Sequence, residues 1–258
     1  MSDALPRWPH GARAAIALSY DDAMPCHLDQ VVPALAAWEL RATFYITVGG
    51  AGFLPRVAEW RAVAAAGHEL GNHTIFHPCR GAAGTTPLYP HLANDLRQYG
   101  PDRFRTELTV ANYVLQTVDG RTERTYGGTC HNVTLGPDDA PQRIEPILRP
   151  LFVAGRGECR NEVTHPLTAD LANLGTTRGD GAGFATWRAA IEATVAAGGF
   201  TLFTFHGVAE SLVRLHVAAA EHQQLLQYLR AQRDLVWTAP VVEVARWIRD
   251  ELQAKAEQ

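Results

Sequence analysis

The chain has 258 residues, 47% of them hydrophobic, which is enough to bury one large core. Its formal net charge is -4 at pH 7 and its 23 basic residues are scattered, which argues against a nucleic-acid partner. The longest apolar stretches are short and interrupted by Gly, Arg or His, so we expect neither a membrane span nor a membrane partner. Residues 1–10 lack a basic start and an apolar core, so we expect no secretory signal and a cytoplasmic location.

Short apolar runs bounded by turn-forming residues predict strands along the whole chain. They span 14–20, 42–47, 68–72, 124–127, 151–154, 200–205 and 235–238. Segments with apolar residues at helical spacing predict helices at 30–40, 55–66, 106–118, 184–197, 217–232 and 241–248. This alternation indicates an α/β protein with a mainly parallel sheet or barrel in a single domain, with its core at about 14–248. The loops at the carboxyl ends of the strands are then expected to form the functional site.

Two aspartates and two histidines stand where predicted strands end. Asp21 and Asp22 close the first apolar run, and His73 and His77 follow the third. A divalent metal that activates water takes about three protein ligands from His and carboxylate and keeps one position open. Asp22, His73 and His77 supply such a set, and the spacing of the two histidines predicts that both rings share one face of a helical turn.

Asp21 is left over by this assignment. Adjacent residues of an extended chain point in opposite directions, so both aspartates serve one site only if the strand ends there. One aspartate then binds the metal while the other faces the attacking water as general base. Taken alone, an Asp-Asp pair is commonly a turn or a helix cap, so the prediction depends on the combination with the histidines.

Three segments carry a resemblance to a known family. They are Ser-Tyr-Asp-Asp at 19–22, Gly-His-Glu-Leu-Gly-Asn-His-Thr-Ile-Phe-His at 67–77, and Gly-Gly-Phe-Thr-Leu-Phe-Thr-Phe-His at 198–206. With the intervening pattern from roughly 14 to 248, the chain resembles the polysaccharide deacetylases of the NodB homology domain, carbohydrate esterase family 4. This resemblance implies a distorted (β/α) barrel and metal-dependent removal of acetyl groups.

Carried over position by position, the resemblance implies roles for five side chains. Asp21 is the general base, and Asp22, His73 and His77 are the metal ligands. His206 is the general acid that protonates the leaving amine or alcohol. Histidine suits that task because it titrates near neutral pH, although a histidine at a strand end is more often structural.

One part of the family pattern is missing. Many members carry an Arg-x-Pro-Tyr-Gly type motif after the fourth strand, where this chain reads Thr-Tyr-Gly-Gly-Thr-Cys-His at 125–131. The resemblance puts Gly127 in place of the arginine that orients the base, and Cys130 where a backbone N–H completes the oxyanion hole. A backbone donor survives a change of side chain, whereas an arginine does not. Arg156, expected where a barrel loop begins, is either the substitute that supports Asp21 or an ordinary surface charge.

Two segments rich in turn formers, 77–90 and 155–183, are typical of functional loops. Planar polar and aromatic side chains bind sugar hydroxyls and acetamides, so Arg80, Tyr89 and His131 are candidate substrate-binding residues.

The four cysteines, Cys26, Cys79, Cys130 and Cys159, show no Cys-x-x-Cys spacing, which argues against a zinc ribbon. In a chain without an export signal we expect them to be reduced thiols.

The motifs and the resemblance together predict a metal-dependent deacetylase that acts on an N-acetylated or O-acetylated carbohydrate, oligosaccharide or sugar-containing small molecule. Zn²⁺ is the expected metal, and Co²⁺, Ni²⁺ and Mn²⁺ also suit the ligand set. Two alternatives stay open: a hydrolase of a non-sugar amide on the same scaffold, and a catalytically silent carbohydrate-binding relative. The sequence leaves the oligomeric state open.

Overall fold

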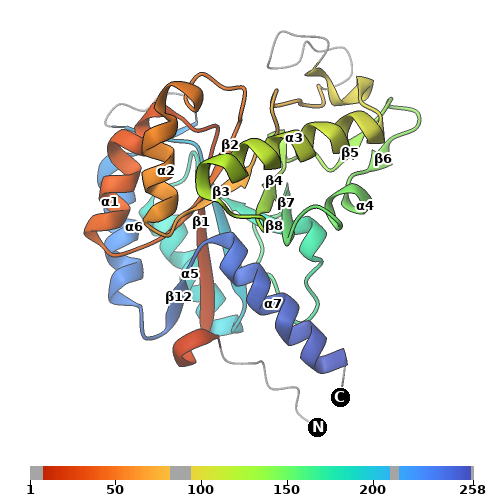
Figure 1. Ribbon diagram of the computed structural model, residues 1–258. Helices are drawn as coiled ribbons and strands as arrows, with labels where there is room; N and C mark the ends of the chain where they lie inside the picture. Colours follow the sequence, from red (N-terminus) through yellow and green to blue (C-terminus); the bar gives the residue numbers. More distant parts are fainter. Residues whose placement is uncertain (1–7, 82–93, 210–214, 257–258) are drawn as a thin grey trace.

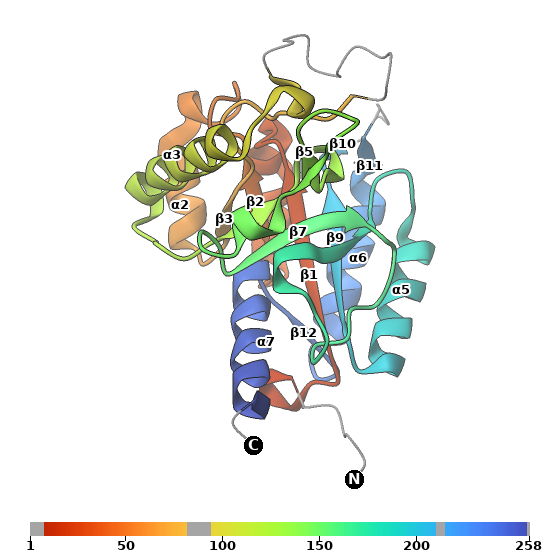
Figure 2. The same ribbon diagram turned by 90° about the vertical axis from the view of Figure 1, so that its right-hand side faces the viewer.

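The computed structural model describes residues 8–81, 94–209 and 215–256 (Figures 1 and 2). Its centre is a closed barrel of parallel strands in the order β1-β2-β3-β4-β7-β8-β9, with β9 pairing back onto β1. The strands are β1 (Ala14–Asp21), β2 (Thr43–Ile46), β3 (Glu69–Asn72), β4 (Thr125–Gly127), β7 (Ala154–Cys159), β8 (Leu174–Arg178) and β9 (Phe200–Phe205). An additional strand, β12 (Val236–Thr238), pairs with the first half of β1, and β2 pairs with the end of β1. This exchange of neighbours along β1 distorts the barrel.

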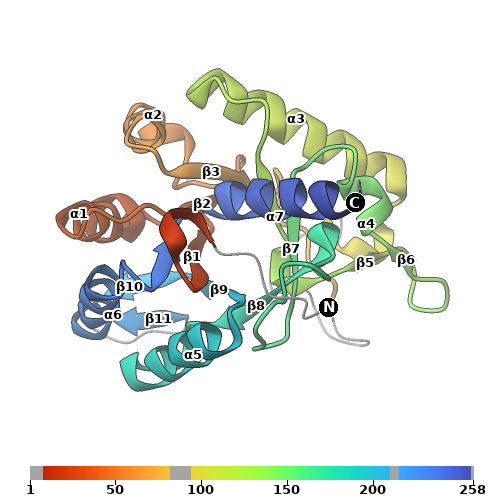
Figure 3. The same cartoon turned by 90° about the horizontal axis from the view of Figure 1, so that it is seen from below.

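Helices surround the barrel, as the view from below shows (Figure 3). They are α1 (Val32–Ala37), α2 (Val57–Ala65), α3 (Pro101–Asp119), α4 (Glu145–Leu148), α5 (Phe184–Ala197), α6 (Ala219–Ala231) and α7 (Val241–Ala256). Ile16, Leu18 and Tyr20 on the outer face of β1 belong to one large buried cluster with side chains of α1, α2, α5 and α6. Small ladders, β5 (Thr134–Leu135) with β6 (Gln142–Arg143) and β10 (Gly207–Ala209) with β11 (His216–Ala218), lie in the loops. Within the described ranges, no helix combines the length and the apolarity needed to cross a membrane.

The inner face of the barrel changes from apolar to polar along its axis, and β1 shows the change. Alternate residues of a strand point to the same face. Ala15 and Ala17 belong to an apolar cluster with residues of α7, which closes the amino end of the barrel. Further along the same face, Ser19 and Asp21 are buried against Arg156. The polar end of the barrel is therefore the end where the strands finish.

The strand expected at 151–154 is wrong. Residues 149–153 form a turn after α4, in which the amides of Leu151 and Phe152 donate to the carbonyl of Leu148. This run is apolar because Phe152 packs in a buried cluster with Tyr126. The strand β7 begins only at Ala154, and so Arg156 lies inside the strand.

The sequence pattern does not predict β8. Its middle residue, Thr176, is buried in the barrel and bonds the hydroxyl of Thr204 at 2.6 Å and the carbonyl of Leu202 at 2.9 Å. Because the barrel interior is polar at this level, β8 lacks the apolar alternation by which half-buried strands are recognised.

Helix α3 is longer than the predicted segment 106–118. It begins at Pro101, where a proline suits the first turn, and ends before Gly120, whose φ of 71° permits the left-handed end of a helix. Glu107 of α3 accepts from the amides of Ile75 and Phe76 in the loop after β3, which brings the helix close to the candidate site.

Candidate metal centre

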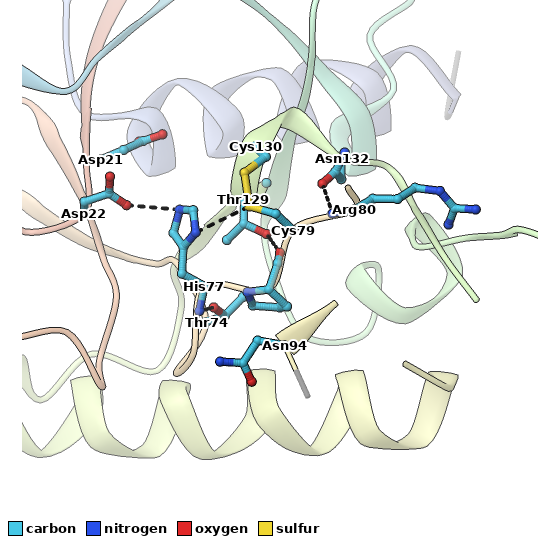
Figure 4. The surroundings of a disulfide bond; sticks show 12 residues. Asp21, Asp22, Thr74, His77, Cys79, Arg80, Asn94, Thr129, Cys130 and Asn132 are labelled. Atoms are coloured by element: carbon cyan, nitrogen blue, oxygen red, sulfur yellow. Dashed lines mark hydrogen bonds and ion pairs between the residues drawn. A yellow bond between two sulfur atoms is a disulfide. The ribbon is translucent and has the colours of Figure 1, made fainter. Parts of the chain in front are cut away.

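The three predicted metal ligands meet at the carboxyl end of the barrel. Figure 4 shows two of them, Asp22 and His77, facing each other. Asp22 follows β1, and the two histidines lie in the loop after β3. Asp22 Oδ1 is 3.1 Å from His77 Nε2 and 3.5 Å from His73 Nε2. One ligand atom from each residue lies within 4.8 Å of the other two, as a single small cation requires.

The donor atoms fit a cation. His73 Nε2 is buried and has no hydrogen-bond partner in the described structure, although buried polar atoms are normally paired. His73 Nδ1 bonds the carbonyl of Gly127 at 2.7 Å, which directs the lone pair of Nε2 into the site. Burial lowers the pKa of His73 to about 4, so its ring is neutral near pH 7, as a metal ligand must be. Burial raises the pKa of Asp22, but the hydrogen bond with His77 outweighs this effect, and the pKa is lowered to about 2.

The predicted helical turn across His73 and His77 is wrong. The segment is a loop in which Thr74 and His77 have positive φ values of 65° and 51°. Side chains replace the helical hydrogen bonds: Thr74 N–H donates to Asn72 Oδ1, and His77 N–H donates to Thr74 Oγ1. The two rings still approach each other, with 4.8 Å between their centroids.

Asp21 is held by an arginine inside the barrel. Arg156 Nη1 donates to Asp21 Oδ1 at 2.7 Å and Nη2 donates to Oδ2 at 2.6 Å, and both residues are buried. Such two-point pairing fixes the plane of the carboxylate. Burial raises the pKa of Asp21, but the charge and the hydrogen bonds of Arg156 more than offset this effect and hold the pKa well below its usual range. Asp21 is therefore ionised at neutral pH.

Gly127, which aligns with the missing family arginine, is the register partner of Arg156 on the neighbouring strand. The arginine thus enters the barrel at the same level but from β7. A Cβ atom at position 127 would lie 2.6 Å from Cγ of Tyr45, because the Tyr45 ring fills this space. The Arg156 guanidinium carbon lies 4.7 Å from the centroid of that ring.

His206 directly follows β9 and reaches the same centre. Its Nε2 is 3.9 Å from Asp21 Oδ2. Asp180 follows β8 and holds His206 at two points. Asp180 Oδ1 accepts from the backbone amide of His206 at 3.0 Å, and Asp180 Oδ2 bonds Nδ1 of the His206 ring at 2.6 Å. Burial lowers the pKa of His206, but the hydrogen bond with Asp180 and the charge of Asp21 have the larger, opposite effect. The net result is a pKa raised to about 8. The ring is therefore mostly protonated at pH 7.

Sequence reasoning missed Asp180. The turn-forming run Arg-Gly-Asp-Gly at 178–181 could have indicated a strand end with a site residue. It does so only if the preceding residues are recognised as the strand β8. Reasoning also missed His27, whose Nε2 bonds the backbone carbonyl of His206 at 2.7 Å.

Cys79 and Cys130 form a disulfide beside the site (Figure 4). The expectation of reduced thiols is therefore wrong for these two residues, whereas Cys26 and Cys159 are free. The loops after β3 and β4 lie side by side because these strands are neighbours in the barrel, which brings together cysteines 51 residues apart. Cys79 Sγ also lies 3.5 Å from His77 Nδ1.

The candidate substrate-binding residues differ in their placement. Arg80 points away from the metal ligands (Figure 4), and its guanidinium bonds Asp138 at 2.7 Å and the carbonyl of Gly136 at 2.8 Å. His131 is half-buried near the site, with Nδ1 3.3 Å from the carbonyl of Gly157. Burial and the charge of Arg156 lower its pKa to about 4. Tyr89 lies outside the described residues.

The barrel thus carries, at its carboxyl end, a cluster of residues that could hold a metal ion. Comparison with known proteins shows what the chain is similar to. Residues 10–129 match the family model "Polysaccharide deacetylase". This match covers 120 of the 258 residues, and in that part the chain is similar to a family that includes the NodB and carbohydrate esterase family 4 proteins.

Solved structures share the fold across nearly the whole chain. A putative polysaccharide deacetylase from Mycobacterium smegmatis is 17% identical with a TM-score of 0.60, covering 97% of this chain and 95% of its own. A family 4 acetyl xylan esterase from Clostridium thermocellum, in complex with a cobalt ion, is 17% identical with a TM-score of 0.53, covering 89% of each chain. A peptidoglycan deacetylase from Bacillus subtilis, solved as a mutant, is 14% identical with a TM-score of 0.51, covering 94% of this chain and 95% of its own. At these identities the likeness shows the common fold.

Proposed function

We propose that this protein is a divalent-metal-dependent hydrolase that removes acetyl groups, most simply N-acetyl groups, from a carbohydrate or a sugar-containing small molecule. One observation carries the proposal. The three-ligand set of Asp22, His73 and His77 lies at the same barrel end as an ionised aspartate and a protonated histidine.

Each residue of the site has a separate role in the proposed acyl transfer. When bound, a divalent cation would supply polarisation of the acetyl carbonyl and a water of lowered pKa. Asp21 Oδ2 lies within 4 Å of both His73 Nε2 and His206 Nε2, so this oxygen faces the reacting centre. Asp21 accepts the proton of the attacking water there, and Arg156 keeps the carboxylate in the required orientation.

His206 has the properties of the general acid. Its pKa of about 8 leaves it protonated before the reaction, and Asp180 holds Nδ1 so that Nε2 faces the site. Nε2–H then donates its proton to the departing amine or alcohol. The backbone N–H of Cys130 and the ring of His131 are the proposed contacts for the acetyl oxygen and the substrate.

Neither alternative function is favoured by a specific contact. A catalytically silent relative would not need a base paired with an arginine or an acid held by a carboxylate. This chain has both, in the pairs Arg156–Asp21 and Asp180–His206. A cytoplasmic location is retained as a proposal, but the Cys79–Cys130 disulfide weakens it because disulfides persist mainly in oxidising compartments.

Acetate release tests the function. The protein is incubated with N-acetylated and O-acetylated mono- and oligosaccharides and with a non-sugar acetamide, after chelation and after addition of Zn²⁺, Co²⁺, Ni²⁺ or Mn²⁺. We expect acetate from at least one sugar, loss of activity with chelator and recovery with metal. Chelator-resistant activity would contradict metal dependence, and release only from the non-sugar amide would favour that alternative.

A further inference from the structure

The loop that carries His73 and His77 lies outside the sheet, yet each of its backbone amides is held. His73 N–H donates to the carbonyl of Ile46 at 3.0 Å. The amides of Thr74 and His77 donate to side chains within the segment itself, those of Asn72 and Thr74. The remaining amides, those of Ile75 and Phe76, are held from another element.

That element is α3, which runs beside the loop. Glu107 Oε1 accepts from Ile75 N–H at 3.1 Å and from Phe76 N–H at 3.0 Å. The second oxygen, Oε2, accepts from the hydroxyl of Tyr99 at 2.8 Å. Glu107 is buried, with 5% of its surface exposed, so solvent competes little for these bonds. A single carboxylate thus joins the middle of the metal loop to a 19-residue helix.

The same helix also holds the start of the loop. Asn72 Nδ2 donates to the carbonyl of Leu108 at 2.9 Å and to Asn112 Oδ1 at 2.7 Å, while Asn72 Oδ1 accepts from Thr74. Residues of α3 therefore hold the chain at two places: at Asn72, directly before His73, and at Ile75 and Phe76, between the two histidines.

We propose that Glu107 is a positioning residue for the metal centre: it fixes the loop so that His73 and His77 are preorganised for the cation. This inference rests on the proposed metal site. The geometry gives the reason. Thr74 and His77 both have positive φ values, and Ile75 and Phe76 are the two residues between them. Without an acceptor for the two amides, the loop has alternatives to the conformation that directs both rings at Asp22.

Groups that orient metal ligands without touching the metal usually contribute about 10- to 100-fold to metal affinity. Glu107→Ala should therefore weaken Zn²⁺ binding by about that factor, measured by competition with a chromophoric chelator on the full chain. Glu107→Gln should retain most of the affinity, because its amide oxygen can accept from the same two N–H groups. This rescue separates loop positioning from any requirement for negative charge.

Leu108→Ala is the matched control. Leu108 is buried on the same helix, and its truncation weakens packing without removing its backbone carbonyl or the Glu107 contacts. We expect this variant to be less stable but to bind Zn²⁺ like the wild type. Hydrogen exchange of the Ile75 and Phe76 amides in the metal-free protein is the second readout: it should accelerate in Glu107→Ala and stay slow in Leu108→Ala.

The outcomes separate this inference from the function on which it rests. Wild-type affinity and slow exchange in Glu107→Ala, or an equal loss of affinity in Leu108→Ala, would overturn the role of Glu107. Absence of Zn²⁺ binding by the wild type would instead overturn the metal site. If Glu107→Ala does not fold, Glu107→Asp replaces it, because the shorter side chain withdraws the carboxylate from both amides and should weaken Zn²⁺ binding relative to Glu107→Gln.

Discussion

Arg156 and Asp21 form a two-point ion pair inside the barrel, although 135 residues separate them in the chain. The arginine comes from β7, next to the glycine at which the family pattern places it on β4. Tyr45 occupies the space beside Gly127, so the barrel accommodates the guanidinium from β7 and leaves no room for a side chain at position 127. The function of the missing motif residue is thus proposed to be retained by a different strand.

The first prediction concerns this pair. Arg156 lowers the pKa of Asp21, so Arg156→Met should raise it and move the acidic limb of the kcat/KM profile to higher pH. Loss of orientation should reduce kcat/KM by about 10²-fold, with metal content unchanged. Arg124→Met is the control, since Arg124 is also buried and paired, with Asp119, but lies at the amino end of β4. An equal shift of the acidic limb in the control would refute the specific role of Arg156.

The second prediction concerns the metal ligands. The double variant His73→Ala, His77→Ala should lose stoichiometric divalent metal, because two of the three converging ligands are removed. Metal analysis after dialysis against trace chelator provides the measurement. His68→Ala is a suitable comparison, because His68 is buried near the same strand and bonds the amide of Ala42 instead. Retention of metal by the double variant would rule out this site.

The third prediction separates base from acid. Asp21→Asn should keep its metal and lose about 10²–10⁴-fold in kcat. His206→Ala should slow an acetamide much more than an activated aryl acetate, because an amine needs a proton on departure and an activated phenolate does not. Steady-state rates on both substrates test this. Equal losses on the two leaving groups would show that His206 is not the acid.

The fourth prediction follows from Asp180. In the folded protein the pKa of His206 is raised to about 8, with Asp180 opposing the effect of burial. Asp180→Asn should lower this pKa and move the basic limb of the kcat/KM profile to lower pH. The raised pKa also stabilises the fold below the unfolded pKa of about 6.5, and this contribution is lost as pH rises through 8. Chemical denaturation at pH 6 and pH 9 should therefore show a smaller pH dependence in the variant.

The fifth prediction concerns the disulfide. Linking residues 51 positions apart restricts the unfolded chain, so Cys79→Ser, Cys130→Ser should lower the free energy of unfolding by about 2–4 kcal/mol. Reductant should lower the stability of the wild type to the same value. The pair Cys26→Ser, Cys159→Ser should respond to reductant like the wild type, because these thiols are free. A reductant-insensitive wild type would argue against the bond.

Local patterns were sufficient to predict the strands that carry the site. Apolar runs that end in Asp21-Asp22 and His206 predicted β1 and β9, with the candidate site residues at their ends, because buried strands and turn residues leave a short-range signal. Patterns failed at β8, whose buried residues are polar, and at 151–154, where apolar residues pack in a turn. The pattern of apolar residues indicates which residues are buried. It does not indicate whether a buried residue belongs to a strand or to a turn.

By itself, the sequence determined that the candidate metal ligands, base and acid stand at strand ends, since residue type and spacing are local properties. Only the tertiary structure decided that Arg156 meets Asp21, that Asp180 holds His206, that Cys79 joins Cys130 and that Glu107 holds the loop between two ligands. Each of these contacts depends on which strands and helices lie side by side and at what register. That order is set by the closure of the whole barrel, which no short stretch of the chain encodes.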